Sequence, residues 1–380
     1  MKYYTIENKN KSIFKTFAIY YIVMVVFCLV RIIASKGVFP DGKVGEIISS
    51  CVIQILVLLL LPFFLYCLML KVSPKQLIKT CNFFKCNYKV ILISFGIGLL
   101  CFFVNLAVSS LFNGILSFTG YDFSKFSSGS GSADMSVGNF FIDLFIVAVL
   151  PAICEEVLHR GIVLQGIKHA GFKKAILVSS VLFALLHFNV QQVAYAFVIG
   201  LILGFVAVVS KNIWPAVIIH FTNNAISIYL DYAAANEWVM GNIMDTIQAG
   251  LTSNNSAAIF IVCVIILLVV IALLFLFIWL LFKQSMLKKV YKAIDEVYDK
   301  KCGTVKDCPI MVSKREIRGD IIENCTLLNL DYRSMENPID AVMPKEKSRY
   351  KTLPRDKVFM WGAVVLGGLV TLFTYIWGLL

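Results

Sequence analysis

Long runs of apolar residues, separated by short polar connections, dominate this chain. Nine of them reach or approach the roughly 20 residues that an α-helix needs to cross about 30 Å of hydrocarbon. Apolar positions are continuous within each run, whereas the strands of a transmembrane β-barrel alternate. The pattern therefore predicts an all-α fold, a polytopic transmembrane helical bundle of about eight or nine spans. The predicted spans are 16–34, 47–70, 90–112, 139–160, 174–190, 192–209, 214–230, 257–282 and 358–380.

Composition supports a membrane protein. Hydrophobic residues make up 59% of the 380 residues and charged residues 15%, whereas about a quarter of the residues of a soluble globular protein are charged. The formal net charge of +12 could indicate a nucleic-acid partner. The basic residues, however, cluster in the connections between apolar runs, as the positive-inside rule expects. We therefore expect a lipid bilayer, and no nucleic acid, around this chain.

The charges of the loops predict an orientation. The loop 71–89 has five lysines and no acidic residue, whereas the loop 231–256 has acidic residues and neither Lys nor Arg. If the N-terminus is cytoplasmic and the spans alternate, both loops lie on the sides that the positive-inside rule expects. The basic connections 160–174 and 283–357 then also lie inside. We expect a multi-pass protein of a plasma membrane, that of a bacterium, with its first apolar run uncleaved.

These runs divide the chain into five parts. We predict N-terminal helices and loops over 1–138, a catalytic core over 139–230, and an outer loop with one helix over 231–282. A cytoplasmic basic segment follows over 283–357, and a C-terminal transmembrane helix over 358–380. Apolar residues at helical spacing among lysines begin the basic segment. They fit either an amphipathic helix on the inner membrane surface or a solvated helix.

Polar side chains able to do chemistry are concentrated in three of four consecutive apolar runs. Ionised groups in hydrocarbon cost free energy, so a cluster of them inside a membrane protein favours a functional site. The residues concerned are Glu155, Glu156 and Arg160 in EEVLHR, His187 in FALLH, and His220 and Asn224 in HFTNN.

Helical geometry limits which of these groups can act together. Adjacent residues of a helix differ by about 100°, so Glu155 and Glu156 point in different directions. Glu156 and Arg160 are four residues apart, where an ion pair can form, and Glu155 is left to face neighbouring helices. With the predicted boundaries, Glu155 lies within about 10 Å of the cytoplasmic end of its span and His187 lies nearer the middle of the membrane.

A carboxylate, two imidazoles and an amide suit the activation of a water for attack on a carbonyl. Glu155, His187 and His220 could hold a zinc ion, since catalytic zinc commonly has three protein ligands and a water. Without a metal, one histidine and Asn224 could stabilise the developing oxyanion. The structural alternatives are interhelical hydrogen bonds for the histidines and an anchoring ion pair for Glu156 and Arg160.

Two other functions remain open. One is a non-catalytic membrane protein on the same fold that acts by binding, for example as an immunity protein. The other is a transporter, because buried ionisable residues also line ion pathways. The polar segments do not recur as an internal repeat, whereas many transporters contain such repeats.

The three motifs also support a family resemblance. EEVLHR has the form EExxxR, FALLH the form FxxxH and HFTNN the form HxxxN. In this order on separate apolar segments, they resemble the motifs of the CPBP family (CAAX-protease and bacteriocin-processing, or Abi) of intramembrane proteases, which includes proteins like lysostaphin-resistance protein A. The resemblance covers residues 139–230, roughly a quarter of the chain.

The resemblance implies an intramembrane metalloprotease similar to the CAAX prenyl endopeptidases. Its substrate would be a membrane peptide or membrane-associated protein, and its relatives have a link to bacteriocin immunity. Glu155 would be the catalytic carboxylate, with His187 and His220 as its partners and as the zinc ligands.

The remaining motif residues receive supporting roles by the same resemblance. Asn224 would assist catalysis, while Glu156 and Arg160 would shape the site. His159 departs from the family pattern, which more often has an aromatic or apolar residue there, and we assign it no role.

Overall fold

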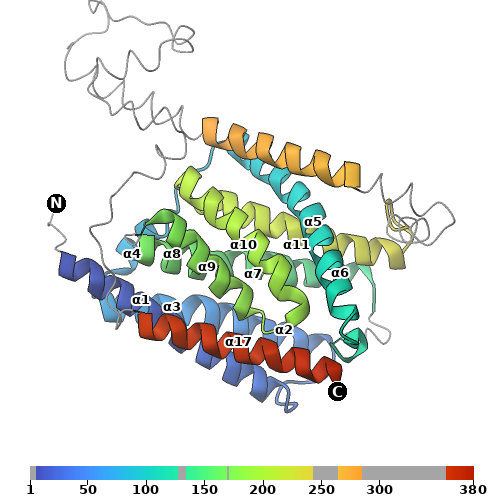
Figure 1. Cartoon of the computed structure of the whole chain (residues 1–380), viewed down its shortest axis with the longest axis horizontal. Helices are drawn as coiled ribbons and strands as arrows, with labels where there is room; N and C mark the ends of the chain where they lie inside the picture. The colour runs from blue at the N-terminus through green and yellow to red at the C-terminus, as the bar shows by residue number, and fades with distance from the viewer. Residues whose placement is uncertain (1–5, 127–133, 169–170, 243–263, 285–356) are drawn as a thin grey trace, which may run out of the picture.

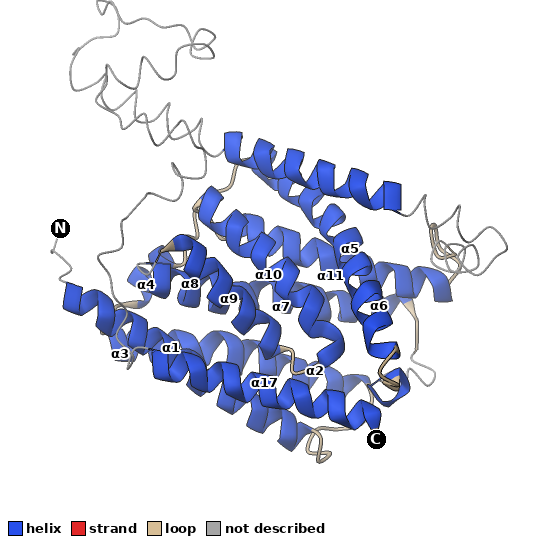
Figure 2. Ribbon diagram, in the orientation of Figure 1, coloured by secondary structure: helices blue, strands red, loops and turns tan. Residues whose placement is uncertain are grey.

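A computed structural model of the chain describes residues 6–126, 134–168, 171–242, 264–284 and 357–380. Within these ranges all regular structure is helical (Figures 1 and 2). Seven of the described helices are long and apolar enough to cross a membrane. The prediction of an all-α, multi-pass membrane protein is therefore confirmed, while the cytoplasmic N-terminus stays a prediction.

The helices follow one another with short connections. Three of them, η1, η3 and η4, are π-helical stretches within longer helices, and η2 is a 3₁₀ turn. The described elements are α1 (Ile6–Ala34), α2 (Lys43–Cys51), η1 (Val52–Leu60), α3 (Leu61–Leu70), α4 (Pro74–Thr80), α5 (Tyr88–Ser117), η2 (Phe123–Phe126), α6 (Val137–Asp143), η3 (Leu144–Val149), α7 (Leu150–Glu156), η4 (Val157–Val163), α8 (Leu164–Ile167), α9 (Phe172–Leu186), α10 (Val190–Ser210), α11 (Trp214–Ala235), the helix Val264–Gln284 and α17 (Val358–Leu379).

Two of the nine predicted spans are not among the seven. The run 174–190 forms α9, whose 15 residues extend only about 22 Å at the usual rise per residue, short of the roughly 30 Å of a hydrocarbon core. The run 214–230 forms α11, which has 22 residues but carries too many polar side chains to count as a span. Both helices lie within the bundle (Figure 1), so the predicted runs are helical, and seven of the described helices are candidate spans by length and composition.

The helix that carries EEVLHR is longer than the predicted span 139–160. A continuous helical path runs from Val137 to Ile167, through α6, η3, α7, η4 and α8. Glu155 therefore lies twelve residues, or roughly 18 Å, from the end of this path instead of five residues from the end of a span.

Pro151 explains part of the irregular course of this helix. A proline inside a helix has no N–H to donate and its ring clashes with the carbonyl of the residue four positions earlier. The π-helical stretch η3 (Leu144–Val149) ends just before Pro151, and η4 (Val157–Val163) follows Glu156. The carbonyl of Val147, which would bond to residue 151 in a regular α-helix, has no donor there. Such widened turns occur frequently at functional sites.

The bundle has two sides around the helices of the candidate site. On one side α17 lies along α1 (Figure 1), where the Phe359 ring contacts Phe14 and Tyr21. On the other side the helix Val264–Gln284 lies against α5, and the Phe277 ring lies against Gly96. The helices α7, α9, α10 and α11 lie between these sides. The site is therefore enclosed by helices from both ends of the chain.

Close approach between α9 and α10 depends on small residues. A Cβ atom added at Gly200 would lie 3.1 Å from Cβ of Ser180, and one added at Gly204 would lie 3.2 Å from Cγ2 of Ile176. This agrees with the packing role expected of a GxxxG pattern. Most of the predicted basic segment 283–357, and residues 243–256 of the predicted outer loop, lie outside the described residues.

Candidate active site

Glu155 and Glu156 point to different partners, as helical geometry predicts. The Glu155 carboxylate reaches a cavity and accepts a hydrogen bond from Nε2 of Gln54 at 3.0 Å. Glu156 is fully buried and accepts a hydrogen bond from Nη1 of Arg160 at 2.6 Å. The predicted ion pair between residues 156 and 160 is confirmed. One carboxylate is thus neutralised inside the bundle, and the other remains open to the cavity.

Arg160 is held by three groups at once. In addition to the ion pair, its Nη2 donates to the carbonyl oxygen of Gly200 at 3.0 Å, and its guanidinium lies 4.6 Å from the ring centroid of Phe183. Planar guanidinium groups favour such combinations of hydrogen bonding and stacking. The pair therefore connects α7, α9 and α10 as well as compensating two buried charges.

His220 is oriented by the same carboxylate. Its Nδ1 lies 3.1 Å from Oε1 of Glu156. Because an ionised carboxylate can only accept a hydrogen bond, Nδ1 carries a proton and donates it to Glu156, and Nε2 is left for another partner.

His187 shows the same arrangement with a different acceptor. Its Nδ1 lies 3.0 Å from the carbonyl oxygen of Phe183, so Nδ1 again donates and Nε2 is left for another partner. His187 lies at the end of α9, directly after Leu186, and lines both of the cavities described below. Both histidines that the sequence singled out thus present the nitrogen suited to accept a proton or bind a metal.

Phe183 holds these groups apart and in place. Its ring centroid lies 5.1 Å from that of His187 and 5.7 Å from that of His220, edge to face in both pairs. Together with the Arg160 contact, the ring touches a member of each of the three motifs. Sequence analysis missed this role, although Phe183 is the first residue of the quoted FALLH motif.

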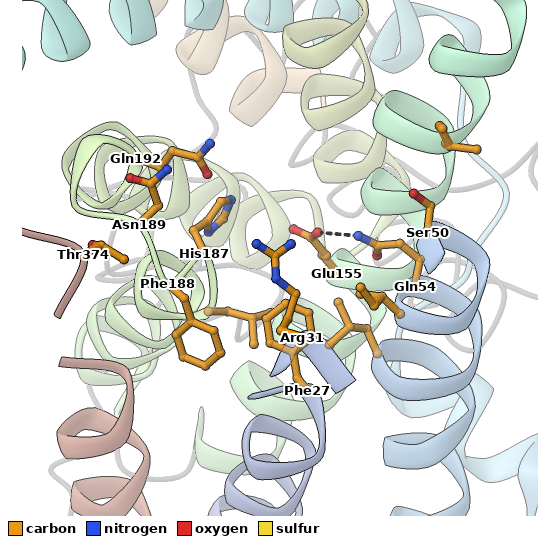
Figure 3. Close-up of a pocket in the computed structure, with 14 residues that line it drawn as sticks. Phe27, Arg31, Ser50, Gln54, Glu155, His187, Phe188, Asn189, Gln192 and Thr374 are labelled. Carbon is orange, nitrogen blue, oxygen red and sulfur yellow. Dashed lines mark hydrogen bonds between the residues drawn. The ribbon is translucent and has the colours of Figure 1, made fainter. Parts of the chain in front are cut away.

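Two cavities meet at the Glu155 carboxylate. One of about 380 Å³ is drawn in Figure 3, and the other, of about 340 Å³, lies beside it. Glu155, His187 and Gln192 line both cavities. His220 lines the second cavity but not the first. We call the first the Arg31 cavity and the second the Asp231 cavity, after a charged residue in the wall of each.

Asn224 has a partner that the sequence did not predict. Its Nδ2 donates to the carbonyl oxygen of Val147 at 3.1 Å, four residues before Pro151, which has no N–H to donate. Nδ2 of the neighbouring Asn223 donates to Oδ1 of Asn224 at 3.1 Å. Both amides also line the Asp231 cavity. The structure thus gives Asn224 a bond between helices and adds Asn223 to the polar wall.

His159 lies away from both cavities. Its Nδ1 lies 2.8 Å from the backbone oxygen of Glu155, and its Nε2 lies 3.3 Å from the hydroxyl of Tyr20. The Tyr20 hydroxyl in turn donates to the carbonyl oxygen of Leu182 at 2.8 Å. His159 therefore contacts the backbone of Glu155, not its carboxylate, and connects the helix of the EEVLHR motif to α1.

Two cavity residues that sequence analysis missed had a weak signal. Gln54 is a polar residue within the apolar run 47–70, and Gln192 begins the run 192–209. A single amide in an apolar run is a much weaker sign of a functional site than a cluster of charged residues, so the sequence alone does not assign either residue to the site. Figure 3 shows the two side chains on opposite sides of the Glu155 carboxylate.

The predicted zinc ligands share one cavity wall but do not form a ligand group. Glu155, His187 and His220 all line the Asp231 cavity. Within the described parts of the chain, however, no three His, Cys, Asp or Glu side chains are close enough together to hold one ion. The side chains in this arrangement do not fit a zinc ion, and zinc binding stays a prediction.

Residues 137–226 match the protein family described as Type II CAAX prenyl endopeptidase Rce1-like. The matched range begins at α6, ends within α11 and contains all six residues that the sequence singled out. No curated protein and no solved structure was found to match the chain. Residues 137–226 therefore constitute an Rce1-like domain of the type II CAAX prenyl endopeptidase (CPBP) family, a membership that implies an intramembrane protease.

Proposed function

We propose that this protein is an intramembrane endopeptidase in which Glu155 activates a water molecule for attack on a peptide carbonyl. The observation that carries the proposal is the position of the Glu155 carboxylate. Glu155 lies where the two cavities meet, and His187 lines both of them as well. The neighbouring Glu156, in contrast, is bound to Arg160 and His220. Carboxylates in such partly enclosed sites commonly act as general bases.

Glu155 and His187 suit the binding of the attacking water. A water molecule between them can donate one hydrogen bond to the carboxylate and one to Nε2 of His187, because both groups are acceptors. The lone pair of the water oxygen then points to the carbonyl carbon. Attack forms the new C–O bond and transfers one water proton to Glu155.

Other residues that line the Asp231 cavity suit the carbonyl oxygen. The amide of Asn223, and Nε2 of His220 when that ring is protonated, can donate to the oxyanion that forms at this wall. The proton held by Glu155 then passes to the leaving nitrogen as the C–N bond breaks. The products are a new carboxylic acid and a new amine, so the atoms of water are fully accounted for.

Substitution of Glu155 by Gln tests the proposal. The amide cannot accept the water proton, so we expect cleavage of membrane-associated peptides in proteoliposomes to fall by about 100-fold or more, with an unchanged thermal unfolding temperature. Glu237→Gln is the matched control, since this exposed carboxylate lies outside both cavities. Normal cleavage by the Glu155 variant would contradict the proposal. Peptide binding without cleavage by the wild type would favour the alternative of a non-catalytic binding protein.

The zinc prediction has its own measurement. The zinc content of the purified wild type is measured by elemental analysis. Nearly one zinc per chain, lost in both the His187→Ala and the His220→Ala variants, would show that a metal takes part in the mechanism. In that case Glu155, His187 and His220 would have to move closer together than they are here. Active protein without metal would leave the mechanism as derived above.

A further inference from the structure

The two cavities differ in charge away from the residues that they share. Among the described residues that line the Arg31 cavity, Arg31 is the one lysine or arginine. The Asp231 cavity contains no lysine or arginine among its described lining residues and has Asp231 in its wall. A peptide that extends from one cavity into the other, across Glu155, therefore has a cation near one part of its chain and an anion near the other.

The Arg31 guanidinium has no partner of its own in the described part of the chain. Arg31 is an exposed residue in the last turn of α1. Its backbone oxygen accepts a hydrogen bond from the N–H of Ser35, whereas its guanidinium takes part in no hydrogen bond or ion pair with a described residue. Arg160 and Lys43, in contrast, are paired with carboxylates. Figure 3 shows the guanidinium extending from α1 into the cavity, on the side of Glu155 and His187. Arginine remains charged at all relevant pH values and presents a fork of donors that matches a carboxylate.

The chemistry of the site sets the direction of the peptide. The groups suited to the carbonyl oxygen, His220 and Asn223, line the Asp231 cavity and not the Arg31 cavity. The acyl half of the scissile bond therefore lies in the Asp231 cavity. The leaving amine half then lies in the Arg31 cavity and continues there toward the C-terminus of the substrate.

The size of the Arg31 cavity limits how far that half can extend. Its volume of about 380 Å³ is near the lower end of the range for small-molecule sites, so it can hold only a short piece of peptide. A carboxylate that contacts Arg31 within this cavity therefore lies a few residues after the cleaved bond. Both a free α-carboxylate and an acidic side chain satisfy this requirement.

We propose that Arg31 is a specificity-determining residue that binds a substrate carboxylate a few residues downstream of the cleaved bond. The proposal rests on the peptidase function proposed above. Arg31 lies in α1, outside the 137–226 family domain. The catalytic helices and the residue that selects the leaving peptide are thus supplied by different parts of the chain.

Three forms of one peptide mixture test this role. The probes are lipid-acylated peptides with a free C-terminus, the same peptides with an amidated C-terminus, and amidated peptides with Glu near the C-terminus. Cleavage in proteoliposomes is followed by mass spectrometry. We expect wild-type kcat/KM to be about tenfold higher for the free acid than for the amide, as one charge-assisted pair can provide. If the Glu-containing amides recover the rate, the carboxylate is a side chain; if they do not, it is the α-carboxylate.

Arg31→Gln should abolish the preference for the acid, and Arg31→Lys should retain part of it. Lys36→Gln is the matched control, because it removes a nearby exposed positive charge that lines neither cavity. It should leave the preference unchanged. Equal cleavage of acid and amide by the wild type, or a preference that survives Arg31→Gln, would overturn the role of Arg31 and leave the peptidase function intact.

Binding to the Glu155→Gln protein separates the two proposals. Its affinity for the free-acid peptides should exceed that for the amides, and the difference should vanish in the Arg31→Gln, Glu155→Gln double variant. Arg31-dependent binding without any cleavage by the wild type would support Arg31 and contradict the peptidase. If the wild type does not cleave the peptides and the Glu155→Gln protein does not prefer the free acid, both the peptidase function and the role of Arg31 are overturned.

Discussion

Nδ1 of His220 lies 3.1 Å from Oε1 of Glu156, so the third chemical motif of the chain is oriented by a carboxylate of the first. The same carboxylate is neutralised by Arg160. Glu156 therefore acts as a positioning residue: it fixes the proton on one nitrogen of His220 and leaves the other nitrogen to the cavity.

The first prediction concerns the buried ion pair. Arg160→Met should lower the free energy of unfolding by about 3–5 kcal/mol, because Glu156 would remain as an uncompensated buried charge. Thermal unfolding in detergent measures the effect. The double variant Glu156→Gln, Arg160→Met should recover part of the loss, since no charge then remains unpaired. An Arg160→Met protein as stable as the wild type would contradict this account of the pair.

The second prediction contrasts two histidines. His187 is half-buried at the cavities, whereas His159 is fully buried against Tyr20. His187→Ala should lower the cleavage rate by about 100-fold with little change in stability. His159→Ala should lower the unfolding free energy by about 2–5 kcal/mol through the cavity left in the core. Cleavage rates and unfolding temperatures of both variants, measured side by side, give the comparison; the reverse pattern would contradict the assignment.

The third prediction tests why Asn224 is present. Its side chain donates to the Val147 carbonyl, which in a regular α-helix would accept from the N–H that Pro151 lacks. In a Pro151→Ala background the backbone N–H returns, so Asn224→Ala should cost less stability there than in the wild type. A double-mutant cycle should give a coupling of about 0.5–3 kcal/mol.

Cleavage rates separate this structural role from a chemical one. If Asn224 also stabilises the oxyanion, its substitution should slow cleavage equally in the wild-type and the Pro151→Ala backgrounds. Additive unfolding free energies in the cycle would contradict the structural role.

The fourth prediction concerns the tight contact between Gly161 and Cys81. A Cβ atom at residue 161 would lie 2.8 Å from Sγ of Cys81, so Gly161→Ala should destabilise the protein by about 1–3 kcal/mol. Cys81→Ala should relieve part of this cost. If Gly161→Ala is neutral, the helix of the EEVLHR motif does not pack as closely as described.

Alkylation of the Cys81 thiol provides a second readout. Burial raises the pKa of this thiol to about 12, so at pH 8 it is protonated and unreactive in the folded protein. Alkylation should become faster as the pH rises toward 12. It should also be faster at pH 8 in the Gly161→Ala variant if that substitution opens the contact with Cys81. Mass spectrometry of the labelled peptide measures both effects.

Local composition determined the helices and the chemistry of this protein. Continuous apolar runs predict helices because partition into lipid and backbone hydrogen bonding depend on neighbouring residues. The spacing of EEVLHR correctly predicted that Glu156 pairs with Arg160 and that Glu155 faces elsewhere, since four-residue contacts are local to one helix. The motif order also indicated the family that residues 137–226 match.

Tertiary packing decided what lies around these residues. The sequence does not show that α9 is too short to span, that Asn224 serves the carbonyl freed by Pro151, or that Phe183 touches all three motifs. Nor does it show that Arg31 reaches the cavity at Glu155. These relationships join segments that are distant along the chain, and they exist only because helix packing brings particular side chains together.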